Sequence, residues 1–174
     1  ADDINITNVG NTAAVHGLDY DIIVFLSVAG EDRLTVNGNA GDDSIKAQAG
    51  LEAIIDITLN GNDGDDFLSA DAILNGGAGN DILIGGAGDD TINGDDGDDI
   101  IDGRGGTNTI DGGNGADTVL VSGTAAGETL GVTHTAGTVT VAGGLSAGTQ
   151  NISNMERVAI EAGCLLYTSD AADE

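Results

Sequence analysis

A nine-residue repeat fills residues 76–120 and constrains the fold more than any other feature of the chain. Five consecutive blocks each carry glycine at the first and fourth positions and an aliphatic residue at the eighth: GGAGNDILI, GGAGDDTIN, GDDGDDIID, GRGGTNTID and GGNGADTVL. Two further copies precede them, GNAGDDSIK at 38–46 and GNDGDDFLS at 61–69. Because short repeats stack on their neighbours along one axis, this period predicts a solenoid.

The last three positions of each block have the pattern of a short β-strand. Their middle residue, at position eight, is expected to point inward while its neighbours face water. One block cannot bury this side chain alone, but stacked copies can. The predicted inward residues are all aliphatic: Ile45, Leu68, Leu83, Ile92, Ile101, Ile110 and Val119.

The sixth position predicts a ligand. It is aspartate in four of the five contiguous blocks and in both outlying copies, and Asn108 replaces it in the fourth block. Glycines at fixed positions let the backbone adopt positive φ and expose its carbonyl oxygens. Carboxylate and carbonyl oxygens together suit Ca²⁺, which takes about six to eight oxygen ligands. The repeat therefore predicts a calcium-loaded β-solenoid.

Over residues 38–120 the blocks resemble the calcium-binding nonapeptide G-G-x-G-x-D-x-U-x of the RTX (repeats-in-toxin) family. The resemblance implies an all-β fold, a right-handed parallel β-roll or β-solenoid with stacked Gly/Asp turns. Two blocks would form one turn of the coil. Each Ca²⁺ would then lie between block n and block n+2, held by sixth-position aspartates and turn carbonyls.

On this chain, the resemblance implies three stacked pairs in the contiguous array: Asp81 with Asp99, Asp99 with Asp117, and Asp90 with Asn108. Asn108 lacks a charge and its block carries Arg104, so the third site is expected to be weak or empty. The turn glycines assigned to the metal sites are Gly76, Gly79, Gly85, Gly88, Gly94, Gly97, Gly112 and Gly115.

The outlying copies are out of phase with the contiguous array. Asp43, Asp66 and Asp81 are separated by 23 and 15 residues rather than 18. Asp43 and Asp66 would extend the row of Asp81, Asp99 and Asp117 if the segments between them form lengthened and shortened turns on the far side.

Composition agrees with a cation-dependent fold. Thirty acidic and four basic residues give a net charge of −26, and proline is absent. Such a chain repels itself and buries little apolar surface, so we expect folding to be coupled to Ca²⁺ binding. An acidic run is more often a solvated tail, but the fixed nine-residue phase argues against that interpretation. Extracellular modules bind Ca²⁺ at roughly 10⁻⁴–10⁻³ M, which favours a secreted or cell-surface location. The charge disfavours nucleic acid as a partner.

Four segments are predicted. Residues 1–37 and 121–163 are β-rich flanks that resemble each other, the β-roll spans 38–120, and residues 164–174 form a non-native tail that resembles translated sequencing-adapter bases. The lone Cys164 would then not be native, and the chain would be a fragment of a longer protein. The flanks are expected to stack as further coils that shield the ends of the roll.

Two local predictions accompany this division. Ile22–Leu26 and Thr138–Val141 have the β-branched content of strands, and Leu51–Ile57 is compatible with either a helix or a strand.

No motif for catalysis or for a small-molecule substrate is found: Ser-His-Asp, Cys-His and HExxH arrangements are missing, and His16 and His134 have no partners at metal-ligand spacing. Two functions remain open. The first is a calcium-stiffened structural or adhesive segment of a secreted or surface bacterial protein. The second is the carboxy-terminal secretion and folding module of a secreted enzyme such as a protease or lipase. Contacts with a cell surface or a secretion apparatus would be made through the parent protein in either case.

Overall fold

The computed structural model describes residues 2–8, 12–16, 22–25, 32–122, 129–135, 138–142, 149–161 and 165–170. Every regular element in these ranges is a β-strand, and the strands form two nine-stranded sheets. Within the same ranges, no helix is long and apolar enough to cross a membrane. The predicted all-β class is confirmed.

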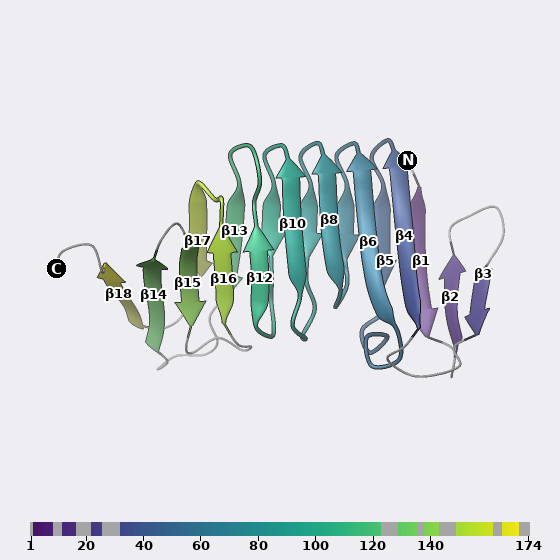
Figure 1. Ribbon diagram of the computed structural model, residues 1–174, viewed down its shortest axis with the longest axis horizontal. Coiled ribbons are helices and arrows are strands. Elements are labelled where there is room, and N and C mark those ends of the chain that lie inside the picture. Colours follow the sequence, from purple (N-terminus) through teal and green to yellow (C-terminus); the bar gives the residue numbers. More distant parts are fainter. Residues whose placement is uncertain are drawn as a thin grey trace.

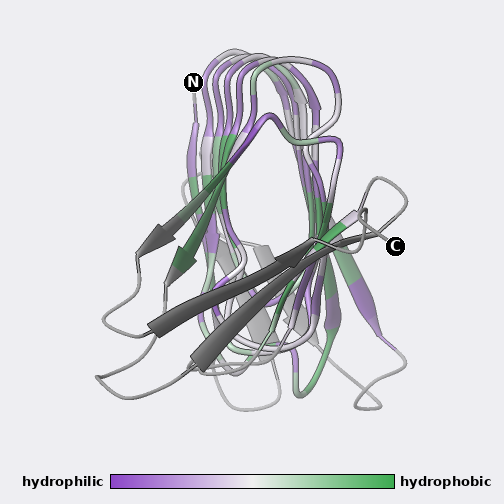
Figure 2. Cartoon of the chain, turned by 90° about the vertical axis from the view of Figure 1, so that its left-hand side faces the viewer, coloured by the Kyte–Doolittle hydropathy of each residue, from purple (hydrophilic) through white to green (hydrophobic). Residues whose placement is uncertain are grey.

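The two sheets face each other across a shared interior (Figures 1 and 2). In spatial order, sheet 1 contains β17 (Arg157–Glu161), β13 (Thr118–Ser122), β11 (Ile100–Asp102), β9 (Ile82–Ile84), β7 (Phe67–Ser69), β5 (Ser44–Ala47), β1 (Asp3–Asn8), β2 (Thr12–His16) and β3 (Ile22–Phe25). Sheet 2 contains β18 (Leu165–Asp170), β14 (Thr129–Thr135), β15 (Thr138–Ala142), β16 (Gln150–Ser153), β12 (Asn108–Asp111), β10 (Thr91–Asp96), β8 (Ile73–Ala78), β6 (Asp56–Asp63) and β4 (Arg33–Ala40).

From β4 to β13 the chain passes from one sheet to the other at every turn, so that successive coils stack as a parallel β-roll. In the contiguous array Ile92 pairs with Ile110 and Ile101 with Val119, each 18 residues apart. Two nonapeptides therefore form one coil, as the resemblance implied. The turns that lead from sheet 2 to sheet 1 lie along the upper edge in Figure 1 and are called the upper turn row: residues 38–43, 61–66, 76–81, 94–99 and 112–117.

The return turns form the lower turn row, and they absorb the irregular spacing of the outlying copies. Val36 pairs with Leu59 and Leu59 with Leu74, at intervals of 23 and 15 residues. The longer interval contains residues 48–55, where the backbone N–H groups of Ile54 and Ile55 both donate to the Leu51 carbonyl. Leu51–Ile57 was expected to be either a helix or a strand. The structure shows a single tight turn at the start of this segment and strand β6 from Asp56 onward.

The core is a line of aliphatic side chains along the axis of the roll. All seven eighth-position residues have 0 % exposed surface, as predicted. Strand alternation directs the sixth-position side chain inward as well, because positions six and eight share a face. Figure 2 shows hydrophobic strands along the walls and hydrophilic turns at the upper edge.

The flanks continue both sheets, but only in part as further coils. β1 stacks in parallel on β5, and β16 and β17 stack in parallel on β12 and β13. The β1–β2–β3 strands and the β14–β15–β16 strands pair antiparallel instead, which corrects the expectation of a uniform coil. Parallel stacking needs a full crossover between strands, whereas short connections such as the one between β14 and β15 bring the next strand back antiparallel.

The strand expected at Thr138–Val141 is present as β15, and the one expected at Ile22–Leu26 is present as β3 up to Phe25, while Leu26 lies outside the described residues. β18 pairs in parallel with β14. The non-native origin of residues 164–174 stays a prediction, as do the four segment boundaries, and Cys164 lies outside the described residues.

Replacing Ile101 with alanine tests the inward line of side chains. Ile101 is fully buried, so we expect a loss of about 2–5 kcal/mol in the free energy of unfolding in saturating calcium. The neighbouring Ile100 faces outward with 43 % of its surface exposed, and Ile100→Ala should change stability by less than about 1 kcal/mol. Denaturant unfolding measures both. Equal losses would contradict the assigned faces.

Candidate metal centre

The upper turn row joins its coils through one repeated hydrogen bond. In each turn the backbone N–H of the sixth residue donates to Oδ1 of the sixth residue in the next coil: Asp43 to Asp66 at 2.6 Å, Asp66 to Asp81 at 2.7 Å, Asp81 to Asp99 at 2.8 Å and Asp99 to Asp117 at 2.9 Å. The structure therefore places all five predicted aspartates in one stacked row, the outlying Asp43 and Asp66 included.

The second carboxylate oxygen has a different environment. The Oδ2 atoms of Asp66, Asp81, Asp99 and Asp117 are buried and accept no hydrogen bond from any described residue. Burying an ionised carboxylate is costly unless its oxygens are paired or coordinate a cation. Each of these turns therefore leaves one strong acceptor that nothing in the described part of the chain satisfies.

Backbone carbonyls converge on the same place. A Cβ built on Gly94 would lie less than 3.0 Å from both Asp99 Oδ2 and the carbonyl oxygen of Gly112 in the next coil. Gly76 stands in the same relation to Asp81 Oδ2 and the Gly94 carbonyl. Since oxygens flank a space that any side chain would fill, glycine at position one keeps room for a cation between carboxylate and carbonyl oxygens. These donors fit Ca²⁺.

The fourth position of these turns requires positive φ. Gly79, Gly97 and Gly115 have φ values of 137°, 138° and 143°, which L side chains rarely adopt. A Cβ on Gly97 would also collide with the carbonyl oxygen of Gly79 in the preceding coil. The predicted glycines Gly76, Gly79, Gly94, Gly97, Gly112 and Gly115 thus all shape the upper turn row.

Burial raises the pKa of the row's carboxyl groups. Desolvation by burial raises the pKa of Asp81 to about 7 and that of Asp99 to about 6. Neighbouring carboxylates add to the rise, and the hydrogen bond from the backbone N–H of the preceding coil opposes it. The same causes raise the pKa of Asp66 and of Asp117. In the absence of a cation, the Asp81 carboxyl group would thus be partly protonated near pH 7.

The lower turn row brings Asp90 and Asn108 together, as the stacking rule implied, but with different bonding. The Asp90 N–H donates to Asn108 Oδ1 at 2.8 Å. Both oxygens of Asp90 are satisfied, because Oδ1 accepts from the Ala72 N–H at 2.7 Å and Oδ2 from the Gly86 N–H at 2.9 Å. Desolvation by burial still raises the pKa of Asp90 to about 6.

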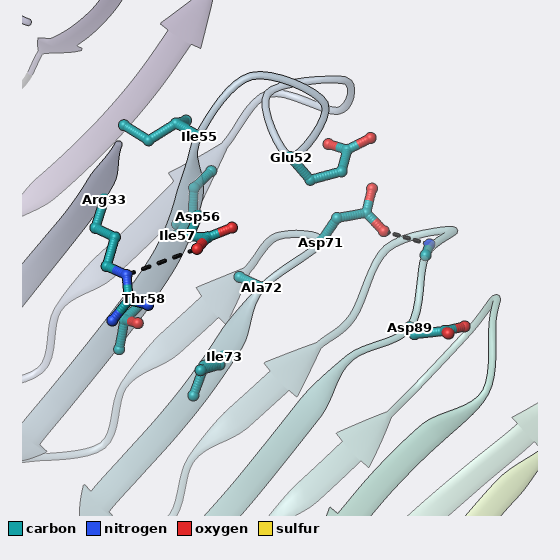
Figure 3. A pocket seen from close by; sticks show the side chains of 11 residues that line it. Arg33, Glu52, Ile55, Asp56, Ile57, Thr58, Asp71, Ala72, Ile73 and Asp89 are labelled. Carbon is teal, nitrogen blue, oxygen red and sulfur yellow. Dashed lines mark hydrogen bonds and ion pairs between the residues drawn. The ribbon is translucent and has the colours of Figure 1, made fainter. Parts of the chain in front are cut away.

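Two of the predicted glycines belong to this lower turn. A Cβ on Gly85 would collide with Asp90 Oδ2 and the Gly103 carbonyl, as in the upper row. Gly88 differs from its equivalents: its φ is not positive, and its N–H donates to Asp71 Oδ1 at 2.5 Å. Figure 3 shows this bond at one side of an open groove of about 330 Å³, where the exposed Arg33 and Asp56 side chains also pair at 3.7 Å.

Sequence reasoning missed residues at both ends of the upper row. The Asp117 N–H donates to Glu156 Oε2 at 2.8 Å, which repeats the row's bond with a longer side chain from a shortened turn. At the other end the Asp2 N–H donates to Asp43 Oδ1 at 2.6 Å. The likeness of Glu156-Arg157-Val158 to Asp32-Arg33-Leu34 did not reveal this role, because Asp32 precedes β4 of sheet 2 whereas Glu156 precedes β17 of sheet 1.

Within the described ranges, no three His, Cys, Asp or Glu side chains lie close enough together to hold a metal ion by themselves. Any cation in the upper row must therefore draw much of its coordination from backbone carbonyls, as the glycine-rich turns allow.

A profile of the RTX calcium-binding nonapeptide repeat matches the chain in four copies, at residues 35–51, 58–72, 73–101 and 84–119. Residues 35–119 are an array of RTX repeats. RTX nonapeptide repeats bind Ca²⁺, so the RTX array is a calcium-binding module. No curated protein matches the chain.

The raised pKa values predict that calcium uptake by the RTX array displaces protons. Asp81 and Asp99, with pKa values of about 7 and about 6, must lose their protons to bind a cation at pH 6. Calorimetry at pH 6 in two buffers of different ionisation enthalpy should detect proton release, and at pH 8.5 it should detect almost none. Asp96→Asn, at an exposed third position that does not contribute to these shifts, is the matched control and should leave the release unchanged.

The same shifts set the pH dependence without calcium. A folded-state pKa above the ordinary aspartate value of 3.8 stabilises the protonated folded form. This contribution to the free energy of unfolding is complete below about pH 4 and is lost as the pH rises through 6 to 7. Proton release that is equal at pH 6 and pH 8.5 would contradict the buried, metal-facing carboxylates.

Proposed function

We propose that the RTX array binds Ca²⁺ in the gaps between successive turns of the upper row and serves as a calcium-stiffened structural module of a secreted or surface protein. The observation that supports this most is the stack of buried Oδ2 atoms in Asp66, Asp81, Asp99 and Asp117, which accept no hydrogen bond from the described residues. A divalent cation in each gap would supply the missing partner.

The proposed ligands are the sixth-position carboxylates of the upper row, Asp43, Asp66, Asp81, Asp99 and Asp117, together with turn carbonyls. Glu156 takes the aspartate's place beyond the last repeat. Two ionised carboxylates about 5 Å apart repel by about 3 kcal/mol at an effective dielectric constant of about 20. This repulsion recurs along the row, so the calcium-free roll is destabilised in every coil.

Ordering of the roll is then coupled to the calcium concentration around it. A ligand that binds only the folded form stabilises that form by mass action. Extracellular calcium-binding modules generally bind Ca²⁺ at roughly 10⁻⁴–10⁻³ M, a level found outside cells. We therefore propose secretion or surface display, followed by folding in extracellular calcium.

A structural role suits the continuity of the core. The eighth-position side chains form one uninterrupted line, and β1, β16 and β17 prolong the stacking beyond the repeats. A module built this way transmits stiffness along its axis once the cations are bound. The RTX repeat is itself a structural element rather than a catalytic one.

Small-angle scattering with and without chelator tests the calcium-driven ordering. In chelator, the radius of gyration should approach the value of about 44 Å expected for an unfolded chain of this length. Millimolar Ca²⁺ should reduce it to roughly half and restore the β-sheet signal in circular dichroism, and equimolar Mg²⁺ should not. A compact β-structure that persists in chelator would contradict the proposal.

The two turn rows make a matched pair of variants. Asp99 faces the gaps toward Asp81 and toward Asp117, so Asp99→Ala should weaken calcium binding in both. Both Asp90 oxygens already accept hydrogen bonds, so Asp90→Ala should lower the stability of the folded form with no loss of bound ions. Equilibrium dialysis counts the ions. Equal losses in the two variants would contradict the assignment of the metal to the upper row.

A further inference from the structure

We infer that the side-chain amide of Asn108 takes the place of the cation in the lower turn row, which makes this edge of the roll metal-free by construction. The inference rests on the proposed calcium sites of the upper row and adds a second, chemically different edge.

Asn108 is fully buried and its amide nitrogen is the centre of a cluster of oxygens. Nδ2 donates to the carbonyl oxygens of Gly103 at 2.6 Å and Gly105 at 2.7 Å, and lies 3.0 Å from Gln150 Oε1. The orientation of the amide is fixed, because Oδ1 must accept from the Asp90 N–H. An NH₂ group thus stands where carbonyl oxygens from two coils converge.

This position is equivalent to that of the orphaned oxygen in the upper row. Asp99 and Asn108 both occupy position six, and both accept through Oδ1 from the sixth-position N–H of the preceding coil. A Cβ on Gly94 would meet Asp99 Oδ2 and an oxygen of the next coil. A Cβ on Gly103 would likewise meet Asn108 Nδ2 and Gln150 Oε1. The two sites therefore differ chiefly in one atom, an acceptor in Asp99 and a donor in Asn108.

The replacement satisfies the whole lower network. Gln150, also buried, directs Oε1 to Asn108, while its Nε2 donates to the Arg104 carbonyl at 3.3 Å. With Asp90 satisfied by the Ala72 and Gly86 N–H groups, none of these buried side chains is left with an orphaned oxygen or nitrogen. A fully satisfied buried network stabilises one arrangement, whereas an acceptor facing acceptors needs a cation.

The two edges of one coil are therefore held together by different interactions. The upper edge requires calcium, and the lower edge between residues 85 and 150 is held without it. The number of bound ions should therefore be smaller than the number of sixth-position turns.

Two opposite substitutions, Asn108→Asp in the lower row and Asp99→Asn in the upper row, test the inference. Asn108→Asp replaces the donor with a carboxylate oxygen that faces three oxygen acceptors. It should create a new calcium site and raise the number of bound ions by about one per chain. Asp99→Asn makes the reverse change, and should lose bound calcium while keeping a larger free energy of unfolding than Asp99→Ala in saturating calcium.

Equilibrium dialysis counts the bound ions and denaturant unfolding in saturating calcium measures stability, each on the whole chain. Asn80→Asp is the control, since it adds the same charge at an exposed fifth position and should leave the ion count unchanged. If wild type binds calcium but Asn108→Asp gains no ion, the inference is overturned while the proposed function stands. If Asn108→Asp does not fold, the two Asp99 variants decide, and an Asp99→Asn variant that is no more stable than Asp99→Ala in saturating calcium overturns the inference. A wild-type chain that binds no calcium would overturn both.

Discussion

A buried carboxylate oxygen that receives no hydrogen bond from the described residues is the constraint on which the upper edge of the roll depends. Strand alternation makes it unavoidable, because the sixth and eighth positions of each nonapeptide face the same interior. The eighth residue, aliphatic in every block, stabilises the stack, while the sixth carries a charge into it. Desolvation raises the pKa of Asp81 and Asp99, and a cation between the coils relieves this strain on the charged form. In the function proposed for the array, calcium is thus part of the packing of the coils.

The same backbone serves both edges. In the upper and lower rows alike, a sixth-position N–H binds Oδ1 of the next coil, so stacking itself does not require metal. The two rows differ in the second polar atom of the side chain. Asp99 Oδ2 is an acceptor for which the proposed partner is a cation, whereas Asn108 Nδ2 is itself a hydrogen-bond donor. Asn108 departs from the repeat pattern, but its amide therefore joins the coils in a second way that needs no cation.

The nine-residue period, together with the RTX resemblance that implied two blocks in each coil, made much of this predictable. It placed Asp81, Asp99 and Asp117 in one row and identified every eighth-position core residue. It did not reveal the antiparallel strands of the flanks, since these have no period from which to infer pairing. Gln150 and Glu156 were also missed, because they reach Asn108 and Asp117 from 42 and 39 residues away through a flank without a repeat. Only three-dimensional stacking brings them to the turns.

The position of the cations is the central claim, and anomalous X-ray scattering measures it directly. Crystals grown in calcium and recorded at a long wavelength should show anomalous peaks between successive upper turns, including those of Asp81, Asp99 and Asp117. The space beside Asn108 Nδ2 should show none. Peaks beside Asn108, or empty gaps between Asp81 and Asp99 in saturating calcium, would contradict the account.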